Sequence, residues 1–530
     1  PFSSSLFRLR LLNFMFKTSK QYGIENNEQF LFVLGIIVFI LLVTSLIFKA
    51  ITAYAQVRFV QMFNYSISKR LIEDYLYQPY SWFLSRNSAD LGKTILSEVA
   101  TVVGGGIRPL MEIISKGVIT VTLIILLIIV DPKLTAIVCF SLGGTYVILF
   151  YFIRSFLDRI GKDRLKSNES RYMAVSEAFG ASKEVKVGGL EETFINQFSN
   201  SAKIFARTQA SVSVLGQLPR FFLEAIIFGG MLIIILTTIG KSESFISILP
   251  IISLYAFAGY RLLPALQHMY ASFTQLAFVG PALDKLYFDI KKLKSFNKNF
   301  SQEILSFNKS IKLNNVCYNY PNVIRTTLKN LNLTFPAKTT IGIVGSTGSG
   351  KTTTVDIILG LLEAQKGTLE VDGKVITKQN VRSWQRSIGY VPQHIYLSDD
   401  TVKANIAFGT DPKDVNQDMV EKAAKIANLH QFVIDELPKQ YDTITGERGV
   451  RLSGGQRQRV GIARALYHNP KVLIFDEATS SLDNQTEQAV MEAVNKLKKD
   501  ITIILIAHRL TSLKNCDKIF KLEKGQIVEQ

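Results

Sequence analysis

The stretch GIVGSTGSGKTTT (residues 342–354) has the residue types and the spacing of a loop that holds phosphate groups. Gly345 and Gly350 are separated by four residues, and Lys351 and Thr352 follow directly. Glycines let backbone N–H groups close around phosphates, and the N-terminus of the following helix adds a positive dipole end. In such loops the lysine reaches the β- and γ-phosphates and the hydroxyl after it binds Mg²⁺. The residues predicted to contact a nucleotide here are Gly345, Ser346, Thr347, Gly348, Ser349, Gly350, Lys351, Thr352 and Thr353.

A second stretch, KVLIFDEATSSLD (residues 471–483), places two carboxylates at the end of an apolar strand. Asp476 at the strand tip suits the coordination shell of Mg²⁺, and Glu477 could polarise an attacking water. Adjacent acids after a strand are often part of a solvated loop. The phosphate loop in the same chain favours the catalytic interpretation.

The residues around both stretches predict an α/β domain. IGIV before the phosphate loop is typical of a buried strand and TTVDIILGLL after it of a helix, and similar stretches alternate to the end of the chain. We expect this domain to cover 307–530. The polar residues 291–306 before it are predicted to be a linker.

The first half of the chain is far more apolar and predicts a bundle of membrane-spanning helices. Hydrophobic residues make up 47% of the chain and charged residues only 20%, which is unusual for a soluble protein of 530 residues. Five apolar stretches predict spans, and six is the simpler architecture, so we expect a first span before Pro1; a five-span protein is the alternative. The five stretches are residues 30–48, 117–130, 134–153, 221–240 and 245–260.

The net charge of +18 has its explanation in the loops between the apolar stretches. The connections 58–105 and 158–217 are strongly basic, so the positive-inside rule places them in the cytoplasm. Nucleic acid is therefore not needed as a partner to explain the charge.

Residues 6–20 carry one polar stripe on an otherwise apolar helix, which predicts a helix lying in the outer membrane interface. A remnant of the preceding span is the alternative. The transmembrane domain would thus cover 1–290.

Further motifs identify the second half with a known family. LSGGQRQR (residues 452–459) resembles the signature motif of ABC ATPases, and together with it the other motifs of that family occur in family order over 311–530. The resemblance implies ATP and Mg²⁺ as cofactors, Gln393 as a further metal ligand, and Lys351, Gln393, Glu477 and His508 as the catalytic set. The remaining residues that match family motifs are Tyr320 (adenine stacking), Glu447 (the loop beside the signature), Ser453, Gly454, Gly455 and Gln456 (the signature) and Asp483 (the D-loop).

In this family each ATP lies between the phosphate loop of one ATPase domain and the signature of another. One chain carries one set of motifs and none is degenerate, so the resemblance implies an exporter-type half-transporter that works as a homodimer, with a heterodimer as the alternative. The family also docks two cytoplasmic loops on the ATPase through coupling helices. By position, residues 86–95 and 179–194 would be these helices.

The cargo is suggested by local resemblance to flippases of lipid-linked oligosaccharides (the PglK type) of the bacterial inner membrane. It rests on FKAITAY (48–54), LPRFFLE (218–224) and YRLLPALQH (260–268), and it implies a pyrophosphate site of Lys49, Arg220, Arg261 and His268. Counted from the outer edge, Lys49 and Arg261 would lie roughly 24–29 Å into a core of about 30 Å. The alternatives are cations that merely anchor the interface, and an exporter of a lipid A-like lipid, a drug or a peptide.

Overall fold

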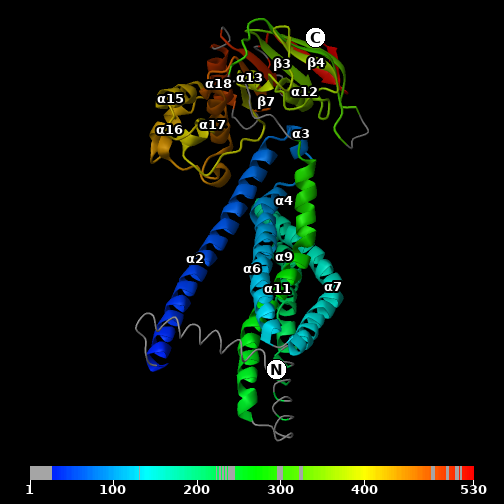
Figure 1. Cartoon of the computed structure of the whole chain (residues 1–530). Helices are drawn as coiled ribbons and strands as arrows, with labels where there is room; N and C mark the ends of the chain where they lie inside the picture. The colour runs from blue at the N-terminus through cyan, green and yellow to red at the C-terminus, as the bar shows by residue number, and fades with distance from the viewer. Residues whose placement is uncertain are drawn as a thin grey trace. The chain divides into compact units, whose positions relative to one another are not determined.

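The computed structural model divides the chain into two compact units. It describes residues 27–130, 132–222, 224–225, 228–229, 232, 236, 245–294, 303–321, 326–478, 484–496, 500–507, 513 and 516–529. We call residues 1–78 and 85–296 the helical unit, and residues 79–84 and 297–530 the α/β unit. Figure 1 shows the helical unit in blue to green and most of the α/β unit in green to red.

The helical unit consists of long helices, several of them far longer than a membrane crossing requires. Two stretches of the described residues, Glu28–Leu76 and Ser88–Ile129, are long and apolar enough to cross a membrane. The elements are α2 (Asn27–Leu76), α4 (Ser88–Lys93), the π-helical turns η1 (Thr94–Glu98) and η2 (Val103–Ile107) with α5 (Val99–Val102) between them, α6 (Arg108–Val130), α7 (Pro132–Gly180), α8 (Ser182–Gly188), α9 (Glu191–Leu215) and α11 (Phe245–Lys292).

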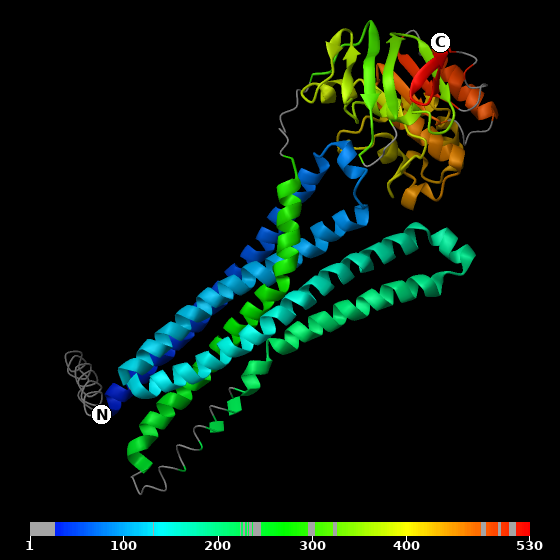
Figure 2. The same ribbon diagram turned by 90° about the vertical axis from the view of Figure 1, so that its right-hand side faces the viewer.

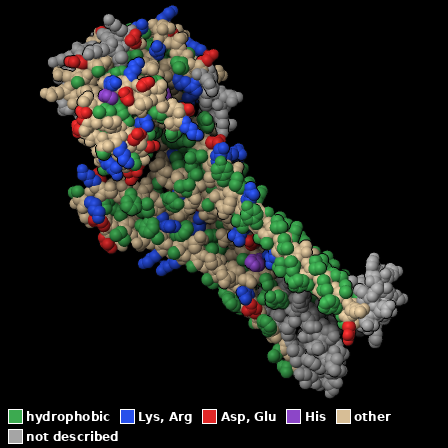
Figure 3. Space-filling view, turned by 90° about the vertical axis from the view of Figure 1, so that its left-hand side faces the viewer, with side chains coloured by type: hydrophobic (Ala, Val, Ile, Leu, Met, Phe, Trp, Pro, Cys, Tyr) green, Lys and Arg blue, Asp and Glu red, His purple; other side chains and the backbone are tan. Residues whose placement is uncertain are grey.

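Four of the five predicted apolar stretches fall within these helices. Residues 30–48 are in α2, 117–130 in α6, 134–153 in α7 and 245–260 in α11. Most of 221–240 and all of the predicted interfacial helix 6–20 lie outside the described residues. Apolar side chains cover much of the surface of the long helices (Figure 3), as expected of a surface that faces lipid rather than water.

Close helix packing in this unit depends on two glycines. A Cβ atom on Gly105 of η2 would come within 2.6 Å of Val279 of α11. One on Gly161 of α7 would come within 2.3 Å of the Phe278 carbonyl oxygen. The helices α6, α7 and α11 run alongside one another (Figure 2).

The α/β unit contains two sheets. The four-stranded antiparallel sheet has the order β2-β1-β4-β5, and the six-stranded sheet has the order β10-β9-β3-β8-β7-β6. The strands are β1 (Ser310–Tyr318), β2 (Leu328–Pro336), β3 (Thr340–Gly345), β4 (Lys366–Val371), β5 (Lys374–Val375), β6 (Ile388–Val391), β7 (Val472–Asp476), β8 (Thr502–Ile506), β9 (Lys518–Glu523) and β10 (Gln526–Glu529).

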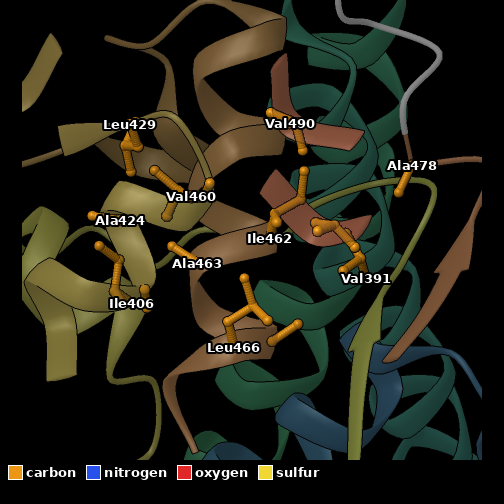
Figure 4. Packing of buried hydrophobic residues seen from close by; sticks show 14 of the residues in the cluster. Val391, Ile406, Ala424, Leu429, Val460, Ile462, Ala463, Leu466, Ala478 and Val490 are labelled. Atoms are coloured by element: carbon orange, nitrogen blue, oxygen red, sulfur yellow. The ribbon is translucent and has the colours of Figure 1, made fainter. Parts of the chain in front are cut away.

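Helices of the α/β unit pack on these sheets and form a separate helical layer. Residues Val460, Ile462 and Leu466 of α17 point into an apolar core with Val391 of β6 and Val490 of α18 (Figure 4). The helical elements are α3 (Tyr80–Phe83), α12 (Lys351–Ile358), α13 (Val381–Gln385), α14 (Val402–Ile406), α15 (Gln417–Ile426), α16 (His430–Glu436), η3 (Gln440–Asp442), η4 (Glu447–Gly449), α17 (Gly454–Tyr467) and α18 (Asn484–Lys496).

Candidate functional site

Three parallel strands bring the phosphate loop and the paired acids to one edge of the six-stranded sheet. In β8, Ile506 pairs with Ile343 of β3 on one side and with Asp476 of β7 on the other. The carboxyl ends of β3 and β7 therefore flank the same residue. This edge is where ligands bind in open parallel sheets.

The phosphate loop is folded around its own lysine. Lys351 Nζ donates to the carbonyl oxygens of Gly345 at 2.8 Å and Ser346 at 3.1 Å. Burial lowers the pKa of Lys351, and the nearby Glu477 and Asp476 carboxylates oppose that shift. Gly350 has a φ of 106°, and a Cβ there would come within 2.7 Å of Leu328, so the loop requires glycine at this position.

Two features of the loop fit a bound phosphate chain. The hydroxyl of Ser349 is buried and has no hydrogen-bond partner within the described part of the chain. The N-terminus of α12 begins at Lys351, immediately after the loop, so its backbone N–H groups are directed to the same place. A lysine, free N–H groups and a hydroxyl are the donor set that phosphate oxygens accept from.

The two acids after β7 have different partners. Asp476 accepts a hydrogen bond from the Tyr390 hydroxyl at 3.3 Å, and burial raises its pKa. Glu477 accepts from Gln393 Nε2 at 2.8 Å and has a φ of 52°, which is uncommon for a residue with a side chain. The structure thus brings Gln393 and Glu477 together, although they are 84 residues apart.

Two neighbours of Asp476 were missed by sequence reasoning. Tyr390 begins the stretch YVPQ, which ends in the predicted metal ligand Gln393. Asp356 follows Thr352 by four residues and therefore lies on the same face of α12. Burial and the Asp476 carboxylate raise the pKa of Asp356 to about 6. The helical spacing of Asp356 from Thr352 was the available signal.

The signature motif forms the start of α17. Ser453 is the N-cap: its hydroxyl accepts from the N–H of Gln456, and the Gln456 side chain accepts in return from the N–H of Ser453. This capping box fixes the first turn, which contains Gly454 and Gly455. The result is a rigid helix N-terminus with an exposed serine hydroxyl beside it, a suitable partner for an anion.

The remaining predicted nucleotide residues are placed only in part. The Tyr320 hydroxyl lies 3.2 Å from Thr353 Oγ1 in the phosphate-loop helix, so the predicted adenine-stacking ring is beside the loop. Glu447 begins η4, five residues before the signature motif. His508 and Asp483 lie outside the described residues.

One short segment from the first half of the chain groups with the α/β unit. Residues 79–84, which contain α3, group with the α/β unit, whereas 86–95 and 179–194 belong to the helical unit. Burial, followed by the Asp356 carboxylate, raises the pKa of Tyr80 in α3. The aromatic run YSWF after Pro79 was the signal available in the sequence.

The four predicted basic residues do not form one cluster of bonded groups. Lys49 of α2 and His268 of α11 are exposed. Arg220 is exposed too, but its Nε bonds Glu224 at 2.6 Å, so its charge is already balanced. Arg261 lies in α11, and its side chain is outside the described residues.

The packing of α11 on α6 corrects the predicted depth of Arg261. The two helices run antiparallel: Ser272 bonds Glu112, Met269 contacts Thr120, and Leu262 packs with Leu127. Arg261 is therefore level with the last turn of α6, near the predicted outer turn rather than the inner boundary. The first turns of α11 extend past the end of α6, and the count from the outer edge did not allow for that overhang.

Comparison with known proteins agrees with this architecture. The family described as ABC transporter matches residues 328–480, and the ABC transporter transmembrane region matches residues 2–262. An ATP-dependent lipid A-core flippase of Wigglesworthia glossinidia brevipalpis is 30% identical over 471 residues, which cover 88% of this chain and 79% of that protein. The chain belongs to the ABC transporter family.

Other relatives agree with this assignment. A lipid A-core flippase of Saccharophagus degradans is 29% identical over 478 residues, covering 88% of this transporter and 78% of that protein. The solved structure of a bacterial Atm1-family ABC exporter with ATP bound has a TM-score of 0.80 and 24% identity, covering 98% of this chain and 91% of that one. This transporter is thus an exporter-type half-transporter in the membrane, whose ATPase binds ATP and is coupled to transport.

Proposed function

We propose that this exporter uses ATP to flip an anionic, lipid A-like lipid across the bacterial inner membrane. The observation that carries the proposal is the similarity over 88% of the chain to lipid A-core flippases. This similarity covers the membrane half, which would recognise the cargo, as well as the ATPase. The similarity therefore favours a lipid A-like cargo over a lipid-linked oligosaccharide.

The residues of the α/β unit have distinct roles in the proposed ATPase reaction. Lys351 and the loop N–H groups hold the phosphates, and Tyr320 stacks on the adenine. Glu477 orients and polarises the attacking water, while its bond to Gln393 makes its position depend on the loop that follows β6. His508, after β8, completes the catalytic set by family resemblance.

Mg²⁺ fits the oxygen groups at this edge of the sheet. Thr352, Gln393 and Asp476 would hold it, and the Tyr390 bond keeps one Asp476 oxygen fixed. When bound, the ion would neutralise charge on the β- and γ-phosphates.

The proposed working unit is a homodimer. The signature residues Ser453, Gly454, Gly455 and Gln456, together with Asp483, would complete the ATP site of a second copy. The capping box of α17 supports this role, because it holds the helix N-terminus ready for the γ-phosphate without rearrangement.

Lys49 and His268 are the strongest candidates for contact with the lipid phosphates. Both are exposed, and neither has an ion-pair partner among the described residues. Arg261 stays a candidate nearer the outer side, and Arg220 is weaker because Glu224 neutralises it.

The test is ATPase stimulation and flipping in proteoliposomes with three compounds: lipid A, a polyprenyl-pyrophosphate glycan and a hydrophobic drug. We expect lipid A to stimulate hydrolysis most and to be flipped. Selective stimulation by the glycan would instead support the oligosaccharide flippase, and stimulation by the drug alone would overturn both lipid assignments.

A variant of Lys49 tests whether the exposed basic residues contact the lipid. Lys49→Ala should lower flipping of lipid A several-fold with little change in unstimulated ATPase activity, because it removes one unbalanced cation. Lys69→Ala on the same helix is the matched control, since Lys69 is near Glu73 at 4.0 Å and far along α2. Equal flipping by both variants would remove Lys49 from the site.

A further inference from the structure

The helix that follows the phosphate loop places a second carboxylate beneath the proposed Mg²⁺ site. Asp356 follows the proposed metal ligand Thr352 by four residues, so both lie on one face of α12. At a rise of about 1.5 Å per residue, Asp356 Cα lies about 6 Å further along the helix axis. Helical side chains lean towards the N-terminus of their helix, so the Asp356 carboxylate is directed back towards Thr352.

The carboxylate of Asp356 is buried without a bonded partner. The residue is only 8% exposed, and its side chain has no hydrogen bond or ion pair within the part of the chain that the structure describes. Its neighbours Val355, Ile357 and Ile358 are at most 1% exposed and belong to an apolar core. A carboxylate in such surroundings costs free energy unless a partner is supplied, so a bound ligand would be its natural source of one.

Two other aspartates of the α/β unit show what a purely structural role involves. The Asp372 carboxylate accepts from three backbone N–H groups at the start of β1, at 2.7 to 2.9 Å. Asp517 Oδ2 accepts from the N–H of Thr340, the first residue of β3, at 2.8 Å. Each of these carboxylates fixes the start of a strand. Asp356 fixes no backbone segment in this way, so support of the fold does not explain it.

The polar groups around Asp356 belong to the metal side of the ATP site. Burial and then the Asp476 carboxylate raise the pKa of Asp356 to about 6, so the two carboxylates lie near each other. The Tyr390 hydroxyl donates to Asp476 at 3.3 Å, and burial, Asp476 and Asp356 raise the pKa of Tyr390. Two repelling carboxylates and one hydroxyl thus meet on the inner side of Thr352, and a cation would remove that repulsion.

We propose that Asp356 is a positioning residue for Mg²⁺, whose carboxylate accepts a hydrogen bond from a water of the ion's hydration shell and adds a second negative charge behind Asp476. A water is the expected partner, because Asp356 is one helical turn farther from the phosphate loop than Thr352, and Mg²⁺ keeps several waters in nucleotide sites. Removing such an outer group commonly lowers metal affinity by about 10–100-fold. This inference rests on the proposed Mg²⁺ site and is independent of the lipid.

The test measures the affinity of the site for Mn²⁺, which prefers the same oxygen ligands as Mg²⁺ and has an EPR signal. The purified transporter in detergent is mixed with less than one equivalent of a non-hydrolysable ATP analogue, so that nearly all nucleotide is bound. Free Mn²⁺ is then followed by EPR during a titration.

Asp356→Asn keeps the size of the side chain but removes its charge, and it should weaken Mn²⁺ binding about tenfold. Asp356→Leu also removes the acceptor oxygens and should weaken Mn²⁺ binding at least as much. Glu523→Gln changes an exposed carboxylate that pairs with Lys521, and it should bind Mn²⁺ like the parent. The Mg²⁺ concentration for half-maximal ATPase activity should rise in parallel in the Asp356 variants, with little change in the maximal rate.

Thermal unfolding without nucleotide and metal separates this role from a structural one. Both Asp356 variants should unfold at the temperature of the parent or above it, because each removes an unpaired buried charge. A lower unfolding temperature together with parent-like Mn²⁺ affinity would overturn the proposal and make Asp356 a structural residue. If Asp356→Asn does not fold, Asp356→Leu carries the test alone.

Thr352→Ala distinguishes a failure of this inference from a failure of the proposed Mg²⁺ site. If Thr352→Ala weakens Mn²⁺ binding and neither Asp356 variant does, the Mg²⁺ site stands and Asp356 has no part in it. If Thr352→Ala binds Mn²⁺ like the parent, the proposed Mg²⁺ site is wrong and the role of Asp356 falls with it.

Discussion

The ATP site and the predicted lipid contacts are built in opposite ways. At the ATP site, Lys351, Asp476 and Glu477 are each held by hydrogen bonds to residues of neighbouring elements. In the helical unit, Lys49 and His268 are exposed and unpaired among the described residues. The buried charge contacts of that unit lie elsewhere, around Lys93 and between Glu98 and Arg164. Phosphate chemistry on ATP requires fixed groups, whereas the proposed lipid contacts are isolated cations.

The largest expected effect is a loss of ATP hydrolysis when Glu477, one of the fixed groups at the ATP site, is changed. Glu477→Gln should lower ATP hydrolysis by about 10²–10⁴-fold, because the amide cannot act on the attacking water. Phosphate release gives the rate, and equilibrium binding of a fluorescent ATP analogue should be nearly unchanged. Glu523→Gln, an exposed carboxylate in the same unit, should keep normal turnover. Substantial hydrolysis by Glu477→Gln would mean that another group polarises the water.

This contrast also explains what could be predicted from sequence. The phosphate loop, the acids after β7 and the signature are contiguous motifs, each fixed by the strand or helix beside it, so their positions followed from local pattern. The bond between Gln393 and Glu477 joins motifs 84 residues apart, and only family resemblance placed both at the site. Tyr390 and Asp356 were missed because their role depends on packing around Asp476.

The helical unit was predictable in outline but not in register. The apolar stretches located α2, α6, α7 and α11, since hydrophobicity over roughly 15 to 20 residues is a strong signal. The depth of Arg261 was wrong, because it depends on how far α11 overhangs α6, and that is set by contacts such as Leu262 with Leu127. The buried ion pair between Glu98 and Arg164 could not be predicted for the same reason, because its two members come from separate helices.

The second effect tests whether the buried ion pair of Glu98 and Arg164 contributes more stability than an ordinary surface pair. Glu98→Gln leaves the buried Arg164 guanidinium without its counter-charge and should lower stability by about 3–5 kcal/mol. Thermal unfolding in detergent measures the change. Asp158→Asn on α7 breaks a 2.6 Å pair with Lys162, but Asp158 is 51% exposed, and the loss should be at most about 0.5 kcal/mol. Equal losses would show that burial is not decisive here.

A third effect measures how much the close packing of α7 on α11 at Gly161 contributes to stability, with no change in charge. Gly161→Ala should cost about 1–3 kcal/mol, because the new Cβ would meet the Phe278 carbonyl oxygen at 2.3 Å and backbone must move. Gly144→Ala in the same helix has nothing within 4 Å and should be neutral or slightly stabilising. Thermal unfolding of both variants is the measurement. If Gly161→Ala were as stable as Gly144→Ala, α7 and α11 would not be in such close contact.

The smallest effect concerns a fixed carboxylate in the α/β unit that has no part in catalysis. Asp372 accepts hydrogen bonds from the N–H groups of Asn308, Lys309 and Ser310 at 2.7 to 2.9 Å, which tie the start of β1 to the β4–β5 turn. Burial raises its pKa, but the three donors outweigh burial, so its pKa is lower in the folded protein. The stabilisation is therefore complete above the unfolded pKa of about 3.9 and is lost as pH falls through the folded pKa.

Asp372→Asn isolates this charge, because asparagine tolerates the left-handed backbone at this position, where φ is 52°. The variant should lose about 1 kcal/mol at pH 7, a value reduced for the solvent around this exposed turn. The loss should be the same at about pH 5 and should shrink below about pH 4. Asp411→Asn, which changes a side chain with a single exposed bond from the Lys413 N–H, is the matched control and should lose far less stability at neutral pH. A constant difference between Asp372→Asn and the parent down to about pH 3 would mean that shape, not charge, holds the turn.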